Sequence, residues 1–362
     1  MSITLDNLRR FAVTRTFFTP ATLKHALDTF GFVQADPIRS PARAQDLTLR
    51  HRVANYRAGD LERLYPRLNI EEDHFINYGF VTDALHSLMH PRISRAKPQD
   101  KRTQALLEFM RKREEVHPRE VDRHFAHGSV KNYWGGSSRS TTHLLSAMHY
   151  RGLVRVARRE GGVRLYSLND RTPVDAGNDP AVQQARIDAL VDIVVRKYAP
   201  LPGATLSAVV SRLRYAAPQW QGLLRDALRR ARERLSQVRV DGIEWYWPAG
   251  EQIATEPPPE VVRLLTPFDP LVWDRRRFEL FWGWAYRFEA YTPPAKRRLG
   301  YYALPMLWRD HVIGWANASV VNGKLQCECG YVGANPRERG FRGELAAEVK
   351  RLSDFLNIAK RR

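Results

Sequence analysis

The chain has 362 residues, which is long enough for two or three domains, and its apolar fraction of 43% is ordinary for a globular protein. The charge is unusual, because 58 Lys and Arg residues outnumber 39 Asp and Glu residues and leave a formal net charge of +19. Such an excess predicts a polyanionic partner, either nucleic acid or an anionic membrane surface.

The residue pattern predicts neither a membrane-spanning nor a secreted protein. The sequence has no run of about 18 apolar residues, and residues 1–6 lack the charged start and apolar core of a signal peptide. Cys327 and Cys329 have no further metal ligands near them in the sequence, so we interpret them as reduced thiols. We therefore expect a cytoplasmic protein, located at the nucleoid in a bacterium, that binds nucleic acid and uses no metal or cofactor.

The first hundred residues predict a domain made of helices around a short strand. Apolar spacing indicates helices over residues 5–13, 21–30, 42–49 and 59–65, with a strand over residues 32–36. We interpret residues 1–100 as a loose winged-helix-like domain.

Two later regions, residues 101–170 and 181–250, each show three helical patterns followed by two alternating segments around a turn. This order is typical of a winged helix, and the two regions form a weak structural repeat. A segment rich in Pro, Gly, Asp and Asn, residues 169–180, is the predicted linker. The helices are predicted over 103–113, from Pro118, and over 138–150, 183–198, 206–213 and 218–235, and the strands over 153–156, 163–166, 238–240 and 243–246.

The sequence pattern changes after Pro257-Pro258-Pro259, where short segments of alternating apolar and polar residues begin. Strands are predicted over residues 301–308, 312–320 and 324–331, and a helix over residues 343–358. Residues 260–362 therefore predict a small antiparallel β-barrel or sheet closed by a terminal helix. The fold class predicted for the whole chain is α+β, with tandem winged helices before this sheet.

Several basic and hydroxyl residues are candidates for DNA contact. In a winged helix the third helix lies against a groove and the hairpin touches phosphate. These positions are Ser138, Arg139 and Thr142 at a helix start, Arg158 and Arg159 on the hairpin, and the clusters at Arg275 and at Lys296, Arg297 and Arg298. Asp274 is placed to pair with an arginine of its own cluster, which would make part of that cluster structural.

The common catalytic templates are absent, but three segments resemble one family. Residues 31–38 (GFVQADPI) contain a Gln–apolar–Asp signature, residues 265–275 read LTPFDPLVWDR, and residues 291–305 read YTPPAKRRLGYYALP. Together they resemble the winged-helix DNA glycosylases of the YcaQ/AlkZ type, in order and in spacing. The resemblance implies three winged helices, a β-barrel, and the removal of N7-alkylguanine-type bases from double-stranded DNA in base excision repair, with interstrand crosslinks unhooked by some members.

The resemblance assigns the catalytic roles to Gln34 and Asp36. Alkylation at N7 leaves the purine positively charged, so the base departs easily and a strong general acid is less necessary. An ionised carboxylate can stabilise positive charge on the sugar and activate water, and an amide nearby can hold that water. No lysine lies in the signature, which indicates a monofunctional hydrolase without a Schiff-base step. We expect the enzyme to act as a monomer.

The segment after Glu71, Glu72 and Asp73 departs from the family pattern. Where many relatives carry a run like WAHEASF, this chain has HFINYGF, so Ile76 and Asn77 replace the usual His and Glu. Asn77 is a candidate supporting residue that could bind DNA or water.

Two other functions stay open at this level. Tandem winged helices and high charge fit a non-enzymatic DNA-binding protein, such as a transcription regulator, equally well. A metal-dependent nuclease would use Asp36 with the acidic run at residues 71–73, whose ordinary interpretation is an acidic surface turn.

Overall fold

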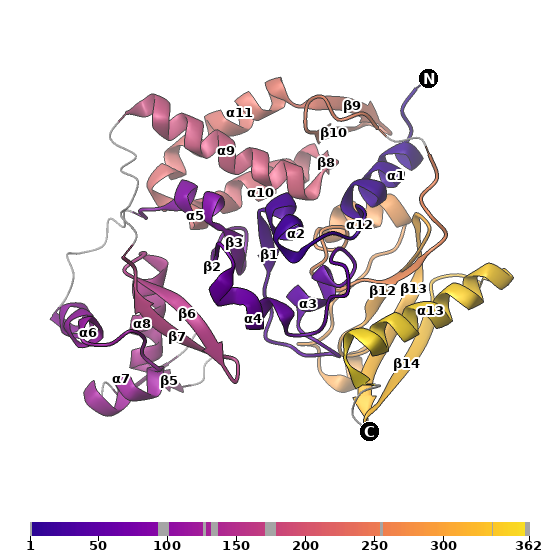
Figure 1. The fold of residues 1–362 in the computed structure, drawn as a ribbon. Helices are drawn as coiled ribbons and strands as arrows, with labels where there is room; N and C mark the ends of the chain where they lie inside the picture. Colours follow the sequence, from indigo (N-terminus) through magenta and orange to yellow (C-terminus); the bar gives the residue numbers. More distant parts are fainter. Residues whose placement is uncertain are drawn as a thin grey trace. The chain divides into compact units, whose positions relative to one another are not determined.

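The computed structural model describes residues 2–92, 101–125, 128–131, 137–170, 179–253, 256–334 and 336–358, with the side chains of 129–131 and 137–139 left out. The chain divides into two compact units. Unit 1 comprises Met1–Leu61, Val191–Val210 and Leu228–Arg362, and unit 2 comprises Glu62–Leu190 and Ser211–Ala227. Figure 1 shows a mixture of helices and antiparallel strands, which confirms the predicted α+β class. The predicted domain boundaries stay a prediction.

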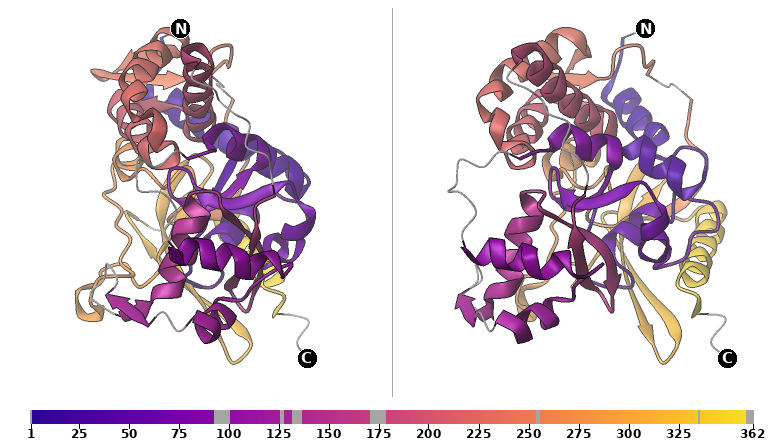
Figure 2. Two further views of the ribbon diagram at one scale, coloured as in Figure 1. Left: turned by 90° about the vertical axis from the view of Figure 1, so that its left-hand side faces the viewer. Right: turned by 60° about the vertical axis from the view of Figure 1, so that its left-hand side comes forward.

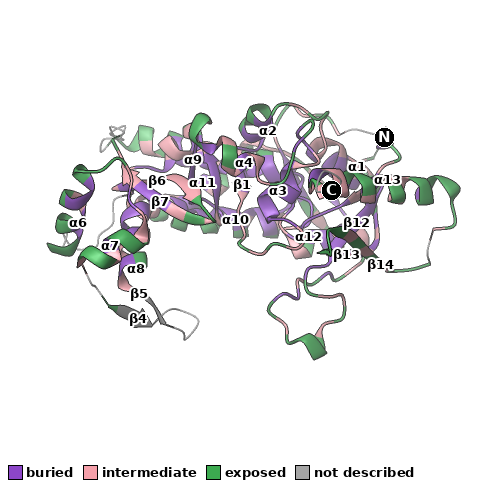
Figure 3. Ribbon diagram, turned by 60° about the horizontal axis from the view of Figure 1, so that its bottom comes forward, coloured by how far each residue is buried: buried purple, intermediate pink, exposed green. Residues whose placement is uncertain are grey.

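Unit 1 begins with helices that have strong start signals. Helix α1 (Leu5–Thr16) starts at a capping box, in which the Thr4 side chain accepts from the Asn7 backbone and Asn7 reaches back to the Thr4 backbone. Thr22 caps α2 (Leu23–Phe30) in the same manner. Strand β1 (Phe32–Gln34) follows and is shorter than predicted, because the chain leaves the extended strand before Asp36. All residues of the next helix, α3 (Ala44–Leu49), are buried (Figure 3).

The middle of the chain supplies three helices and a hairpin, in the predicted order. The helices are α9 (Pro180–Tyr198), α10 (Gly203–Ala216) and α11 (Leu224–Arg234), and a 3-10 turn, η2 (Pro218–Leu223), precedes the last. Strands β9 (Ser236–Val240) and β10 (Ile243–Trp247) pair antiparallel, and β8 (Leu201–Pro202) lies on the other side of β10. Asp241 and Gly242 both have positive φ values, as the predicted two-residue hairpin turn requires.

The C-terminal part of unit 1 is a four-stranded antiparallel sheet in the order β11-β12-β13-β14. Helix α13 (Arg339–Phe355) contacts strand β11 and lies beside the sheet in the views of Figure 2. The remaining elements are helix α12 (Arg275–Trp282), the 3-10 turn η3 (Pro294–Lys296), and strands β11 (Val262–Leu264), β12 (Leu304–Trp308), β13 (His311–Val321) and β14 (Lys324–Tyr331). Side chains from α1, β10, α12 and β12 form one continuous apolar core, including Leu8, Trp245, Phe278 and Leu307.

Unit 2 contains short helices and paired strands and has a second apolar core. Strands β2 (Ile70–His74) and β3 (Tyr78–Thr82) form one hairpin, and β6 (Val154–Glu160) and β7 (Val163–Leu168) form another. Leu106, Val121, Leu145 and Val156 meet in its core. The other elements are α4 (Asp60–Leu64) at the unit boundary, η1 (Tyr65–Arg67), α5 (Asp83–Met89), α6 (Lys101–Arg111), α7 (Pro118–Phe125), α8 (Ser140–Tyr150), and the paired strands β4 (Ser129–Lys131) and β5 (Ser137–Arg139).

The predicted start of the third helix in this region is wrong by two residues. Ser138 and Arg139 belong to strand β5, whose backbone pairs with Val130 and Ser129 of β4, and α8 begins at Ser140. The backbone of these two residues is therefore used in a strand ladder and does not form a helix terminus.

One buried ion pair joins distant segments of unit 1. The guanidinium of Arg52 donates to both carboxylate oxygens of Asp269, at 2.8 and 3.1 Å, and neither side chain is exposed to solvent. Arg52 also donates to the backbone carbonyls of Thr16 and Thr48, and its guanidinium lies 4.5 Å from the centre of the Phe17 ring. The charge of Arg52 is thus balanced by Asp269, and most of its N–H groups donate hydrogen bonds inside the protein.

We expect Arg52→Met to lower the free energy of unfolding by about 3–5 kcal/mol, because the change leaves the Asp269 carboxylate buried without its cation. Urea unfolding followed by circular dichroism measures the effect. Arg111→Met is the matched control, since Arg111 and its partner Glu108 are both well exposed, and it should leave the midpoint nearly unchanged. Equal midpoints for Arg52→Met and the wild type would show that the pair contributes little.

Candidate active site

Gln34 and Asp36 lie where strand β1 ends and an irregular segment begins. Gln34 is the last residue of the strand, and both side chains are partly buried. The Asp36 carboxylate accepts a hydrogen bond from the backbone N–H of Ile38 at 2.9 Å. The backbone N–H of Asp36 lies 3.5 Å from the side-chain oxygen of Gln45, a buried residue of α3. These two hydrogen bonds hold the backbone at Asp36 in place. Only Oδ1 of the Asp36 carboxylate takes part in the bond to Ile38, and Oδ2 does not.

Burial raises the pKa of Asp36 above its usual value, and the hydrogen bond from Ile38 only partly offsets this effect. The carboxylate is therefore less well solvated than an ordinary surface aspartate. A poorly solvated carboxylate interacts more strongly with a nearby positive charge than one in water does.

Two tyrosines from the 291–305 segment lie in the electrostatic field of Asp36. Burial raises the pKa of Tyr302, and the negative charge of Asp36 adds to that increase. The same two causes raise the pKa of Tyr291, although this ring is 72% exposed. The Tyr302 hydroxyl lies 3.1 Å from the hydroxyl of Thr266, in the segment that precedes the Phe-Asp-Pro sequence. The three sequence segments that resembled one family therefore meet in one part of unit 1.

Lys197, on helix α9, contacts the first residue of β1. Its ammonium group donates to the carbonyl of Phe32 and lies 4.9 Å and 4.8 Å from the ring centres of Phe30 and Phe32. Burial lowers the pKa of Lys197 to about 7, the charge of Arg52 adds to this shift, and Asp269 opposes it. Lys197 was not among the predicted site residues. It lies three residues after Val194 on the apolar stripe of this helix, and this spacing is the signal that places its side chain inward.

The basic cluster at residues 275–277 is largely structural. Arg277 is buried and donates to the backbone carbonyls of Tyr198 and Pro270. Arg275 donates to the carbonyl of Val272, and its guanidinium lies 4.7 Å from the centre of the Tyr286 ring. Asp274 caps α12 by accepting from the Arg276 backbone, and its carboxylate also accepts from the Thr205 hydroxyl. Its negative charge partly offsets the burial that lowers the pKa values of Arg275 and Arg277, so the expected pairing is electrostatic, without a direct ion pair to the cluster in the described part of the chain.

The cluster at residues 296–298 lies on a loop with a defined backbone conformation. The buried carboxylate of Glu289 accepts backbone N–H groups from Arg298, Leu299 and Gly300, which fixes the loop. Arg297 donates from Nε to the Thr292 carbonyl at 2.8 Å, whereas Lys296 and Arg298 have exposed side chains. Two cations on a fixed loop suit contacts to phosphate oxygens.

A family model described as DNA glycosylase AlkZ-like matches residues 27–355, which is most of the chain. The chain belongs to the AlkZ-like DNA glycosylase family. It is therefore a DNA-binding hydrolase of DNA repair that acts on N-glycosyl bonds. Its structure also resembles that of the Streptomyces sahachiroi DNA glycosylase AlkZ, with a TM-score of 0.63 at 16% sequence identity, over 98% of this chain and 97% of that chain. At this identity the likeness shows a shared fold. None of the helices that the structure describes is long and apolar enough to cross a membrane.

Of the predicted site residues of this AlkZ-like glycosylase, the two hairpin arginines in unit 2 are engaged with acidic partners. Arg158 forms ion pairs with Glu115 at 2.5 Å and with Glu160 at 3.2 Å. Arg159 binds the buried carboxylate of Glu72 at 2.6 Å. Thr142 is exposed in the first turn of α8, and the side chains of Ser138 and Arg139 lie outside the described part of the chain.

The acidic run of residues 71–73 is not a surface turn. Each carboxylate lies in strand β2 at 1% exposure and has an arginine partner, Arg155 for Glu71, Arg159 for Glu72 and Arg92 for Asp73. Burial opposes ionisation of Glu72, but Arg159, Arg164 and Tyr78 together hold its pKa below its usual value.

The departure from the family pattern falls in the turn after this strand. Ile76 is 3% exposed, and Asn77 is partly buried at the turn, where its carbonyl accepts from the Phe75 backbone. Position 76 therefore supplies apolar contact to the core and offers no titratable group for chemistry.

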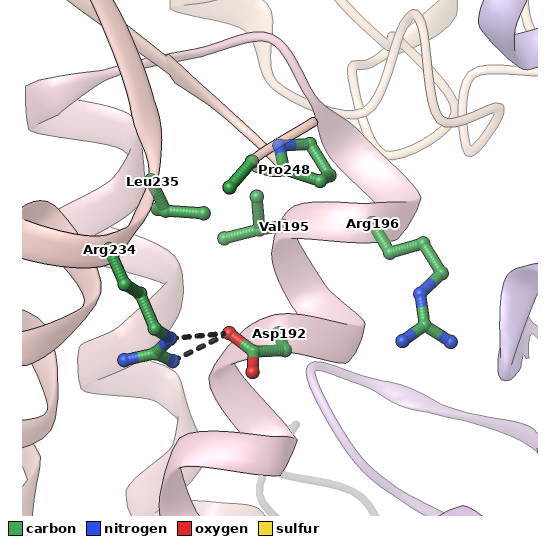
Figure 4. A pocket seen from close by; sticks show the side chains of 7 residues that line it. Asp192, Val195, Arg196, Arg234, Leu235 and Pro248 are labelled. Carbon is green, nitrogen blue, oxygen red and sulfur yellow. Dashed lines mark hydrogen bonds and ion pairs between the residues drawn. The ribbon is translucent and has the colours of Figure 1, made fainter. Parts of the chain in front are cut away.

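A pocket of about 230 Å³ lies in unit 1 between α9, the end of α11 and the segment after β10. Figure 4 shows the ion pair of Asp192 with Arg234 on its wall, and Arg196 extending away from that pair. Val195, Leu235 and Pro248 supply the apolar lining. Neither Gln34 nor Asp36 contributes to it, so this pocket is separate from the signature residues.

We expect Asp36→Asn to leave the fold intact and to be relatively more stable at neutral pH. The folded protein holds the pKa of Asp36 above its unfolded value, so the ionised carboxylate costs stability once the pH rises through the folded pKa. Below the unfolded pKa the cost is absent. The stability difference between the variant and the wild type, from urea unfolding, should therefore grow in favour of the variant between about pH 3.5 and pH 7. Asp28→Asn, at an exposed ion pair with Lys24, should show no such gain, and a variant that loses stability on neutralisation would contradict this account.

Proposed function

We propose that this AlkZ-like glycosylase hydrolyses the N-glycosidic bond of N7-alkylated purines in duplex DNA, with Asp36 as the catalytic carboxylate and Gln34 as its amide partner. The observation that carries the proposal is the environment of Asp36. A partly buried carboxylate lies at the end of β1, with the Tyr302 and Tyr291 phenols in its electrostatic field and with the Thr266 segment beside them.

This environment suits a leaving group that is already positively charged. When an N7-alkylpurine departs, positive charge develops on the deoxyribose, and an ionised carboxylate with little surrounding water stabilises that charge. The same carboxylate accepts a proton from the attacking water. Gln34 can hold that water, because an amide both donates and accepts hydrogen bonds.

The position of Lys197 supports the proposal of a monofunctional mechanism. A Schiff-base step needs an amine that can reach the sugar. Lys197 is the lysine in contact with the signature strand, and it is 4% exposed with its amine directed at the Phe32 carbonyl. Its place in the core favours a supporting role and hydrolysis by water.

DNA binding would come from the helix–hairpin regions and from the exposed loop at Lys296 and Arg298. We propose that residues 101–170 and 181–250 act as winged helices, with Thr142 at the start of α8 as a phosphate contact, and that the enzyme works as a monomer. We include the unhooking of interstrand crosslinks, because Asp36 is only partly buried and the neighbouring Tyr291 is exposed, so a tethered purine need not enter a deep cavity.

We expect Asp36→Asn to lower base release from duplex DNA containing N7-methylguanine at least tenfold, while DNA affinity stays nearly unchanged. Single-turnover assays in the presence of chelator, on a panel that includes crosslinked duplexes, measure both the rate and the substrate range. Asp28→Asn is the control, and it should retain the wild-type rate.

Equal rates for Asp36→Asn and the wild type would remove Asp36 from the mechanism. Tight, sequence-specific binding by the wild type without any base release would favour the alternative, a non-enzymatic DNA-binding protein. Strand scission that chelator abolishes would instead support a nuclease.

The exposed loop gives a separate prediction for binding. We expect the double change Lys296→Gln and Arg298→Gln to weaken duplex affinity across sequences and to reduce the salt slope of binding by about two, because each phosphate contact contributes about one. Fluorescence anisotropy at several salt concentrations measures this. Lys350→Gln serves as the control, since Lys350 pairs with Asp354 on α13, and an unchanged slope in the double variant would exclude the loop.

A further inference from the structure

Unit 2 contains a cluster of metal-binding side chain types that the glycosylase chemistry does not use. Asp73 lies on strand β2, His86 on helix α5, and His90 is the residue that caps the C-terminal end of this helix. Because His86 and His90 are four residues apart at a helix end, both rings project toward the same side. The rings stack with their centres 4.2 Å apart and their planes at 22°.

The three candidate ligand atoms converge on one carboxylate oxygen. Nε2 of His90 lies 2.8 Å from Oδ2 of Asp73, and Nε2 of His86 lies 3.8 Å from the same oxygen. All three groups have ligand atoms within 4.8 Å of one another. In a tetrahedral zinc site with bonds of about 2.0–2.1 Å, ligand atoms are about 3.3 Å apart. The two Nε2–Oδ2 distances of 2.8 and 3.8 Å lie on either side of this value, and coordination needs the stacked rings to turn so that both nitrogens face one ion.

Arg92 fixes the carboxylate in the orientation that such a site needs. It donates from Nη1 to Oδ1 of Asp73 at 2.7 Å, so Oδ2 is the oxygen that faces the two imidazoles. Arg92 is itself held by the carbonyls of His74 and Ala216, both at 2.6 Å, and its guanidinium lies 4.5 Å from the centre of the Tyr150 ring. A hydrogen-bonded partner on the second oxygen is the usual support for a ligating carboxylate.

Gly152 packs closely against the His90 ring. A Cβ at Gly152, whose φ is +77°, would lie 2.8 Å from Nδ1 of His90, so the glycine lets this ring occupy its place. The side chains of Asp73 and His90 are 1% and 10% exposed, whereas His86 is 13% exposed. Both imidazoles keep a small exposure to solvent, so water could complete the coordination.

We propose that Asp73, His86 and His90 form a binding site for one divalent transition-metal ion, for which Zn²⁺ is the best match. Two imidazole nitrogens and one carboxylate oxygen suit zinc, nickel or cobalt better than magnesium or calcium, which take oxygen ligands. The ion links strand β2 to helix α5 within unit 2 and takes no part in base release. The positive charge of Arg92 opposes the cation, so the affinity is lower than that of a site built from thiolates.

Zinc titration of the tag-free full-length protein tests the site. Isothermal titration calorimetry should give one Zn²⁺ per chain for the wild type, and His86→Ala should weaken that binding at least tenfold. His25→Ala, at an exposed histidine of α2, should bind as the wild type does. Zinc should also raise the thermal unfolding midpoint of the wild type and of His25→Ala, but not that of His86→Ala.

Binding of equal strength by the wild type and His86→Ala, or no stoichiometric binding by the wild type, overturns the proposal. X-ray absorption of the wild-type zinc complex is an independent measurement that needs no variant. Two imidazole ligands without sulfur support the site. Sulfur ligands would place the ion at Cys327 and Cys329 on β14 instead and would overturn it.

Discussion

The buried ion pair between Arg52 and Asp269 joins residues that are 217 positions apart in the chain and fixes the part of unit 1 where the signature lies. Asp269 also organises its own loop, because its carboxylate accepts from the Leu271 backbone and its carbonyl accepts from the backbones of Val272 and Trp273. This loop carries Thr266, the partner of Tyr302. The surroundings of Asp36 therefore depend on a charge pair that does not itself touch the carboxylate. In the Phe-Asp-Pro sequence shared with the family, the aspartate has a structural role.

The sequence predicted local structure well where a local signal exists. Helices with capping residues, such as α1 after Thr4, and turns that need positive φ, such as Asp241-Gly242, are confirmed within a few residues. It failed where the deciding contact is distant, since an acidic run gives no sign of arginine partners elsewhere in the chain. The error at Ser138 has another cause, because its partner Val130 is only eight residues away and the short paired segments lack a clear alternating pattern.

The candidate site likewise combines residues that the sequence identifies with residues that only the fold identifies. Gln34 and Asp36 could be named because three separate segments resemble one family, and a single tripeptide would not have sufficed. Lys197, Arg92 and the His86–His90 pair were not named. The spacing of Lys197 and of the two histidines is visible in the sequence, but their partners Phe32 and Asp73 are identified only by contacts across the fold. The formal charge of +19 likewise overstates the charge available to DNA, since basic side chains such as Arg277 and Lys197 are buried. The buried Arg52 and Arg92 do not change the balance, because Asp269 and Asp73 are buried with them.

Lys197 links the stability of the signature strand to proton uptake. In the unfolded chain this amine titrates near its usual value of 10.5, whereas in the folded protein burial brings its pKa to about 7. Between these two values the unfolded chain binds more protons than the folded one, so folding releases part of a proton and alkaline conditions favour it. The strand that carries Gln34 therefore contacts an amine, that of Lys197, whose charge changes within the range of pH found in cells. The anchor of β1 would be neutral in part of the population and cationic in the rest, with the Phe32 carbonyl accepting a hydrogen bond from either form.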